Sequence, residues 1–142
     1  MPRSVFSQEF QARWSDLDSN AHLANTAYLE YAIQCRMAYF HTHGFSPTEF
    51  ARQGFGPVIF REEIVYLAEI RLMEKFRVEL RLGEMTPDGA RYTLLNDIYK
   101  EDGRPAARLR TEAAWLDLRT RKLIAPPDKV RELLARGEEA AA

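Results

Sequence analysis

The sequence predicts an α+β fold in which one antiparallel sheet of five strands wraps around a single long central helix. Three observations predict it. A strand-like segment opens the chain, a helix that is apolar around most of its circumference follows, and further strand-like segments separated by short turns come after the helix. A helix with so little polar surface must be covered, and the apolar face of an antiparallel sheet can cover it.

The first strand is predicted at residues 5–14, where apolar and polar side chains alternate with a period of two. Phe6, Phe10, Ala12 and Trp14 fall on the side that should face the core. A polar loop at residues 15–24 follows this strand.

The central helix is predicted at residues 27–40, with Asn25 as its N-cap and Gly44 as its stop signal. The residues expected to face the core are Leu29, Ile33, Met37 and Phe40. Tyrosines and alanines occupy much of the remaining circumference, so the helix should be buried on several sides.

Ser46 and Glu49 form a capping pattern for a short helix that should end near Gln53. The four later strands are predicted at residues 58–67, 74–85, 91–100 and 106–118, with glycine-containing turns between several of them. In the first of these, the residues expected to share a face are Val58, Phe60, Ile64 and Tyr66. A last helix should run from about residue 126 to residue 134, with residues 137–142 frayed.

Residues 1–142 are expected to form a single domain, because 46% hydrophobic and 29% charged residues are typical of a globular chain of this length. A net charge of −1 gives no electrostatic basis for binding nucleic acid. No segment has the apolar length of a membrane span, and no secretory signal is visible at the start. The only cysteine, Cys35, fits a reducing cytoplasm.

The most informative stretch is the polar loop that leads into the central helix. Asp16, Asp18, His22 and Asn25 lie within ten residues of one another, and no motif for a metal or a bound cofactor accompanies them. The first turn of a helix presents free N–H groups, which can stabilise an oxyanion. A nearby carboxylate can attack a carbonyl carbon or activate water. This combination suits chemistry on a carbonyl group.

The same stretch resembles a family motif. Residues 16–28 read D-L-D-S-N-A-H-L-A-N-T-A-Y, which is similar to the motif D-x-D-x-x-G-H-V-N-N-x-x-Y of 4-hydroxybenzoyl-CoA thioesterase-like proteins. The element order resembles the hotdog fold of these acyl-CoA thioesterases over nearly the whole chain. Ala21 stands where the motif has glycine, and Ala24 stands where it has the first asparagine. The first difference bears on the geometry of the loop, because alanine resists a positive φ.

The resemblance implies roles for individual residues. Asp18 matches the catalytic carboxylate, as nucleophile or as general base. Asn25 matches the residue whose backbone N–H polarises the thioester carbonyl, and Tyr28 matches the final tyrosine of the motif. His22 is open to two interpretations, as a group that acts on the substrate or as a structural residue. Cys35 is interpreted as a packing residue, because no histidine lies at helical contact distance from it.

The resulting prediction is a cytoplasmic acyl-CoA hydrolase that releases a carboxylic acid and coenzyme A and needs no cofactor or metal. Asp18 is its catalytic residue, and His22, Asn25 and Tyr28 bind substrate. Self-association into a homodimer or homotetramer is expected, because the resemblance implies pairing of sheet edges. Two alternatives stay open: a hotdog dehydratase that acts on acyl thioesters through His22 and Asp18, and a non-catalytic module that binds acyl thioesters.

Overall fold

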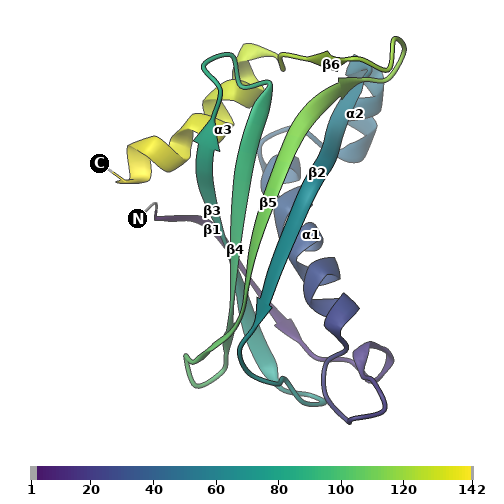
Figure 1. Ribbon diagram of the computed structural model, residues 1–142, viewed down its shortest axis with the longest axis vertical. Coiled ribbons are helices and arrows are strands. Elements are labelled where there is room, and N and C mark those ends of the chain that lie inside the picture. Colours follow the sequence, from purple (N-terminus) through teal and green to yellow (C-terminus); the bar gives the residue numbers. More distant parts are fainter. Residues whose placement is uncertain (1–2, 142) are drawn as a thin grey trace.

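The chain forms one curved antiparallel sheet with a long helix along its concave side (Figure 1). The computed structural model describes residues 3–141. The order of the long strands in the sheet is β1-β3-β4-β5-β2. They are β1 (Ser4–Gln11), β2 (Phe55–Tyr66), β3 (Lys75–Met85), β4 (Arg91–Lys100) and β5 (Pro105–Asp117). The predicted fold class is confirmed, and a short strand β6 (Leu123–Ile124) pairs with β5.

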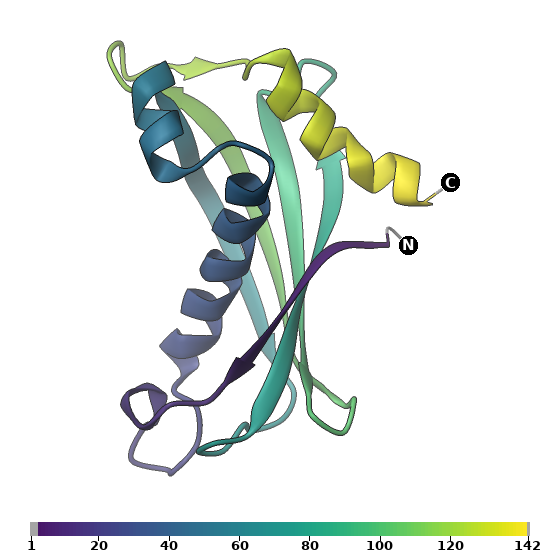
Figure 2. The same ribbon diagram turned by 180° about the vertical axis from the view of Figure 1, so that it is seen from behind.

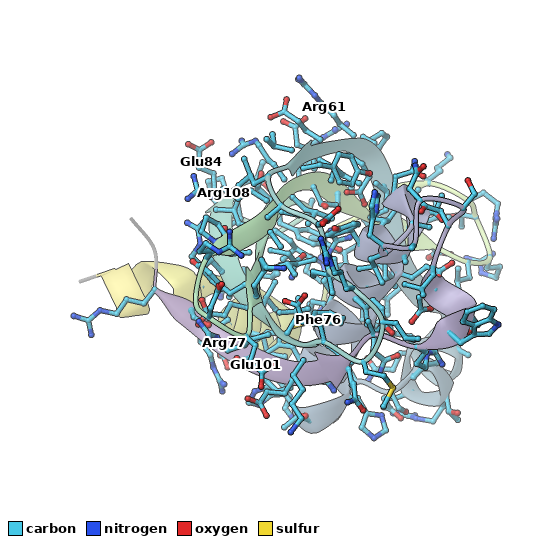
Figure 3. The ribbon with its side chains drawn as sticks, turned by 90° about the horizontal axis from the view of Figure 1, so that it is seen from below. Arg61, Phe76, Arg77, Glu84, Glu101 and Arg108 are labelled. Atoms are coloured by element: carbon cyan, nitrogen blue, oxygen red, sulfur yellow. The ribbon has the colours of Figure 1, made fainter. Side chains whose placement is uncertain are left out.

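The two faces of the sheet differ sharply in polarity. Strand β3 follows the predicted alternation, and its buried apolar residues are Phe76, Val78, Leu80 and Leu82. Figure 3 shows Phe76 among the packed elements, whereas the side chains of Arg61 and Glu84 extend away from the ribbon. The concave face therefore supplies the core, and the convex face is charged.

Helix α1 (Asn25–Thr42) lies along the concave face (Figure 2). Its buried residues are Ala27, Tyr28, Tyr31, Ala32, Cys35, Arg36, Tyr39 and Phe40. Tyr31 packs edge-on against Phe76 of β3, with ring centroids 4.9 Å apart. The flank of α1 that faces the sheet is thus buried, as expected, whereas Glu30, Ile33 and Gln34 on the opposite flank are exposed.

The predicted core face of α1 is right at Phe40, which is buried, and wrong at Ile33. Ile33 was expected in the core, but 45% of it is exposed, and Leu29 and Met37 are only partly buried. Arg36 is buried instead, with 4% exposure. Apolar residues occur all around this helix, so their spacing could not determine which flank faces the sheet.

Arg36 is buried because polar groups of the sheet meet it. Its guanidinium donates to Asn96 Oδ1 at 2.8 Å, to Thr111 Oγ1 at 2.5 Å and to Glu62 Oε1 at 3.1 Å. The Thr111 hydroxyl donates to the second oxygen of Glu62 at 2.6 Å. The network joins the middle of α1 to β2, β4 and β5, and a buried guanidinium requires such partners.

The predicted alternation in β2 is interrupted by a β-bulge between Ile59 and Arg61. Ile59 pairs with Ala113 and Glu62 pairs with Thr111, so both lie on the concave side. Phe60, expected to share a face with Ile64, falls in the bulge and is 55% exposed. An extra residue in one strand changes the face of every residue on one side of it.

Strand β1 ends earlier than predicted. Residues Trp14–Asp16 form a 3₁₀ turn, η1, and Trp14 is 80% exposed where the alternation had placed it in the core. The carboxylate of Asp16 is buried at this point and accepts hydrogen bonds from Arg13, which hold the chain in the turn.

Two further helices cover the other end of the molecule. Helix α2 (Pro47–Gln53) begins as predicted, with the hydroxyl of Ser46 accepting from the N–H of Glu49 at 3.1 Å. Helix α3 (Asp128–Ala141) extends past the predicted end at residue 134, while residue 142 of the predicted frayed end lies outside the described residues. Within residues 3–141, no helix combines the length and hydropathy needed to cross a membrane.

Candidate active site

The polar loop after η1 closes on itself through backbone hydrogen bonds. The N–H of Asp18 donates to the carbonyl of His22 at 3.0 Å, and the N–H of Ala21 donates to the carbonyl of Asp18 at 3.1 Å. The side chain of Asp18 adds a third bond, because its Oδ1 accepts from the N–H of Asn20 at 2.8 Å. Ala21 has a φ of 62°, so the loop keeps a left-handed residue at the position where the related motif has glycine.

The segment between β2 and β3 holds this loop in place. The N–H of Leu23 donates to the carbonyl of Ile70 at 2.7 Å, and His22 forms an antiparallel bridge with Arg71. Both views of the ribbon show the loop and this connection together at the lower end of the molecule (Figures 1 and 2). The loop is therefore positioned by the sheet as well as by its own turn.

Helix α1 starts one residue earlier than it would with the predicted N-cap at Asn25. Ala24 is the N-cap, with no side-chain cap bond, and Asn25 is the first helical residue, so the prediction of Asn25 as N-cap is wrong. The N–H of Ala27 donates to the carbonyl of Ala24 at 2.9 Å. The N–H groups of Asn25 and Thr26 have no hydrogen-bond partner within the described part of the chain. These two groups can bind an anion or a developing oxyanion.

The four predicted site residues line one pocket of about 330 Å³. The full lining comprises Asp18, His22, Leu23, Asn25, Tyr28, Tyr66, Leu67, Ala68 and Glu69. A carboxylate and the start of a helix thus border the same open space. Tyr66 and Glu69 were missed by sequence reasoning, because they follow the loop by some forty residues and no motif marks them.

The two oxygens of the Asp18 carboxylate differ in their hydrogen bonding. Oδ1 accepts the Asn20 N–H, whereas Oδ2 lies 3.8 Å from His22 Nδ1, beyond a direct hydrogen bond. His22 Nδ1 is 3.1 Å from the carbonyl of Leu23. If Nδ1 carries the proton, it donates to that carbonyl and Nε2 is left as the free ring nitrogen. Both side chains are about 30% exposed, so water and substrate can reach them.

Tyr28 and Tyr66 connect the helix start to the β2–β3 connection. The hydroxyl of Tyr28 donates to the carbonyl of Ala68 at 3.1 Å, and the hydroxyl of Tyr66 donates to the carbonyl of Asn25 at 3.0 Å. The two rings pack edge-on, with centroids 5.3 Å apart. Burial raises the pKa of the Tyr28 hydroxyl above its usual range, which keeps it protonated as a donor.

Asp16 does not line the pocket. Burial acts to raise the pKa of Asp16, but hydrogen bonds from Arg13 and Tyr31 outweigh it and hold the pKa below its ordinary value. The hydroxyl of Tyr31 donates directly to this carboxylate. Asp16 therefore orients η1 and the loop, and a buried carboxylate whose two oxygens both accept hydrogen bonds is poorly suited to attack a substrate.

Cys35 lies away from the pocket, in the middle of α1. It is fully buried, and its Sγ is 3.7 Å from the carbonyl of Val78. Burial raises the pKa of the Cys35 thiol to about 12. A thiol in this state is neither accessible nor ionised at neutral pH, as the sequence interpretation expected.

Comparison with solved structures shows the same fold. A hypothetical protein from Staphylococcus aureus, solved in complex with CoA, has a TM-score of 0.89 at 21% identity over 99% of this chain and 87% of its own. A 1,4-dihydroxy-2-naphthoyl-CoA thioesterase from Synechocystis has a TM-score of 0.83 at 17% identity, covering 92% of this chain and 95% of its own. A DHNA-CoA thioesterase from Staphylococcus aureus has a TM-score of 0.84 at 20% identity, covering 94% of this chain and 91% of its own.

At the level of sequence, no curated protein matches the chain. A family profile does, and it spans most of the protein. The profile of the thioesterase-like superfamily matches residues 12–134, which include the loop, the central helix and all strands from β2 onward. The chain therefore belongs to the thioesterase-like superfamily.

Proposed function

We propose that this protein hydrolyses an acyl-CoA thioester to a carboxylic acid and coenzyme A. The observation that carries the proposal is the pocket that Asp18 and Asn25 both line, at the start of α1, where the N–H groups of Asn25 and Thr26 are free. The superfamily supports a thioester as the substrate class. Coenzyme A as the thiol is supported by a structural neighbour in complex with CoA and by two neighbours named as CoA thioesterases.

In the proposed reaction, the thioester carbonyl oxygen accepts hydrogen bonds from the first turn of α1. Charge that develops on this oxygen in the transition state is stabilised by fixed N–H donors and by the helix dipole. Asp18 acts at the carbonyl carbon in one of two ways. It attacks directly, expels the thiolate and forms a mixed anhydride that water hydrolyses, or it accepts a proton from a water molecule that attacks instead.

His22 is placed to assist either route. With its Nδ1 proton directed at the Leu23 carbonyl, its Nε2 can accept a hydrogen bond from water or from the substrate. In the proposed reaction, Tyr28 binds the substrate through its ring, which forms part of the pocket wall. The thiolate of coenzyme A is a weak base, so the reaction does not depend on a strong general acid.

One observation favours a second candidate function, a dehydratase that acts on hydroxyacyl thioesters. His22 Nδ1 and Asp18 Oδ2 lie 3.8 Å apart, so the two side chains could act together on a substrate. A panel of acyl-CoA and hydroxyacyl-CoA substrates separates the possibilities. We expect release of free thiol. Loss of water from the acyl chain without thiol release would indicate the dehydratase, and binding without either reaction would indicate a non-catalytic module.

We also propose that two copies pair through β2 in a homodimer. One long side of β2 has no strand partner within residues 3–141, and unpaired edges of this length are normally covered. Apolar residues in and beside β2 are 45–55% exposed, namely Ile59, Phe60, Val65, Tyr66 and Leu67. Since Tyr66 and Leu67 also line the pocket, a partner at this edge would border the site. A cytoplasmic location suits the free thiol of Cys35.

A further inference from the structure

Tyr66 makes a contact that no sequence motif assigns to it. Its hydroxyl donates to the carbonyl of Asn25 at 3.0 Å, at the point where α1 begins. Its ring packs against Tyr28, whose own hydroxyl donates back to Ala68 at 3.1 Å. We propose that Tyr66 is a positioning residue, which fixes the peptide group between Asn25 and Thr26 so that its N–H can stabilise the oxyanion.

The physical basis is that this carbonyl and this N–H belong to one planar peptide group. The carbonyl of Asn25 and the N–H of Thr26 are joined by a bond with partial double-bond character, so fixing one fixes the direction of the other. A donor on the carbonyl also polarises the peptide and makes its N–H a stronger donor. The N–H groups of the first helical turn have no partner within the helix, so the direction of the Thr26 N–H depends on the contacts made by the rest of its peptide group.

The same connection that follows Tyr66 holds the opposite side of the pocket. Ile70 accepts the N–H of Leu23 at 2.7 Å, and Arg71 forms the bridge with His22. Residues 66–71 therefore contact both the loop that carries Asp18 and the helix start that carries the N–H groups. This segment sets the separation between the carboxylate and the oxyanion-binding groups, and Tyr66 is its contact on the helix side.

Tyr66→Phe tests the proposal, because it removes the hydroxyl and keeps the ring at the pocket wall. Tyr39→Phe is a matched control. The hydroxyl of Tyr39 donates to the backbone carbonyl of Leu133 at 2.9 Å, near the other end of α1 and outside the pocket. The activity measurement rests on the proposed thioesterase function. We expect kcat to fall about tenfold in Tyr66→Phe with KM changed less than about twofold, since only part of one oxyanion interaction is lost. In Tyr39→Phe, kcat should stay within about twofold of the wild type, although loss of the hydrogen bond to Leu133 lowers the stability of this variant.

A spectroscopic measurement separates this proposal from the proposed reaction. Loss of the bond to the Asn25 carbonyl should move the NMR amide-proton signal of Thr26 upfield in Tyr66→Phe and leave it unchanged in Tyr39→Phe. An unmoved Thr26 signal, or an unchanged kcat in an enzyme whose wild type hydrolyses the panel, would overturn the positioning role. A wild type that hydrolyses no thioester would overturn the proposed function, and the Thr26 signal would still decide whether Tyr66 fixes this peptide.

Discussion

Ala21 adopts a φ of 62°, a backbone conformation that costs a residue with a Cβ roughly 1–2 kcal/mol. We expect Ala21→Gly to raise the free energy of unfolding by about 0.5–1 kcal/mol, because relief of this strain exceeds the entropy that glycine adds to the unfolded chain. Ala24→Gly is the control, since Ala24 has a φ of −64° and no strain to relieve. Chemical denaturation of both variants gives the comparison, and equal destabilisation of the two would contradict the expectation.

The sequence identified Ala21 as a departure from the motif but could not show how the backbone responds. The loop could have changed its path, or it could have kept the left-handed residue at a cost. The loop kept the left-handed residue, because two backbone hydrogen bonds determine the turn. The N–H of Ala21 donates to the carbonyl of Asp18, and the N–H of Asp18 donates to the carbonyl of His22. Neighbouring contacts overrode the local preference of one residue.

Asp16 should make stability depend on acidity. Its pKa lies below the ordinary value of 3.8 in the folded protein, so its contribution is complete above that value and is lost as the pH falls through the folded pKa. We expect the wild type to lose more thermal stability between pH 6 and pH 3 than Asp16→Asn does. Melting temperatures of both proteins across this range are the measurement. An equally steep decline in the variant would show that other carboxylates account for the acid sensitivity.

At the scale of elements, the network around Arg36 joins α1 to the sheet. Replacing Arg36 by leucine would leave Glu62, Asn96 and Thr111 without their shared donor. We expect a loss of about 3 kcal/mol in the free energy of unfolding, the range for breaking a buried ion pair, because Glu62 is only partly exposed. Arg110→Gln, on the exposed side of β5, should change it by less than about 0.5 kcal/mol. Urea titration of the two variants measures both values, and a similar small loss in each would mean that the network contributes little.

The strands and the helix differed in how far the sequence determined them. Strand β3 alternates strictly, so its position and buried face were both predictable, and β4 was predicted at the bounds it has. The flank of α1 that is buried was not predictable, because it contains Arg36 and its partners come from three distant strands. The bulge in β2 left no sign in the sequence, since Phe60 is as apolar as the residues that do face the helix.

At the scale of the whole molecule, the open edge of β2 is the basis of the proposed dimer. We expect light scattering at micromolar concentration to give twice the chain mass of 16.4 kDa. Val65→Lys should shift the mass toward one chain, because a charge at the paired edge opposes association. Leu123→Lys introduces the same charge at a residue of similar exposure on β6 and should leave the mass unchanged. A monomeric wild type would contradict the proposal.

The candidate site shows the same division between local and long-range information. Asp18, His22, Asn25 and Tyr28 are close in sequence, and a loop that enters a helix could be expected to gather them. Tyr66 and Glu69 reach the pocket only because β2 is an edge strand that ends beside the start of α1. The order of strands in the sheet was not predictable from periodicity, so these two residues could not be placed.

Asp18 is proposed to act chemically on a thioester, and steady-state kinetics of Asp18→Asn are the sharpest test of this role. Asparagine keeps an oxygen for the Asn20 N–H and removes the charge that attack or proton abstraction requires. We expect kcat to fall about 10²–10⁴-fold on the best acyl-CoA substrate, with the fold intact by thermal melting. Asp16→Asn, which alters a carboxylate outside the pocket, should reduce kcat much less. Near-native turnover in Asp18→Asn would exclude a chemical role for this carboxylate, because Asp18 would then serve only to close the loop.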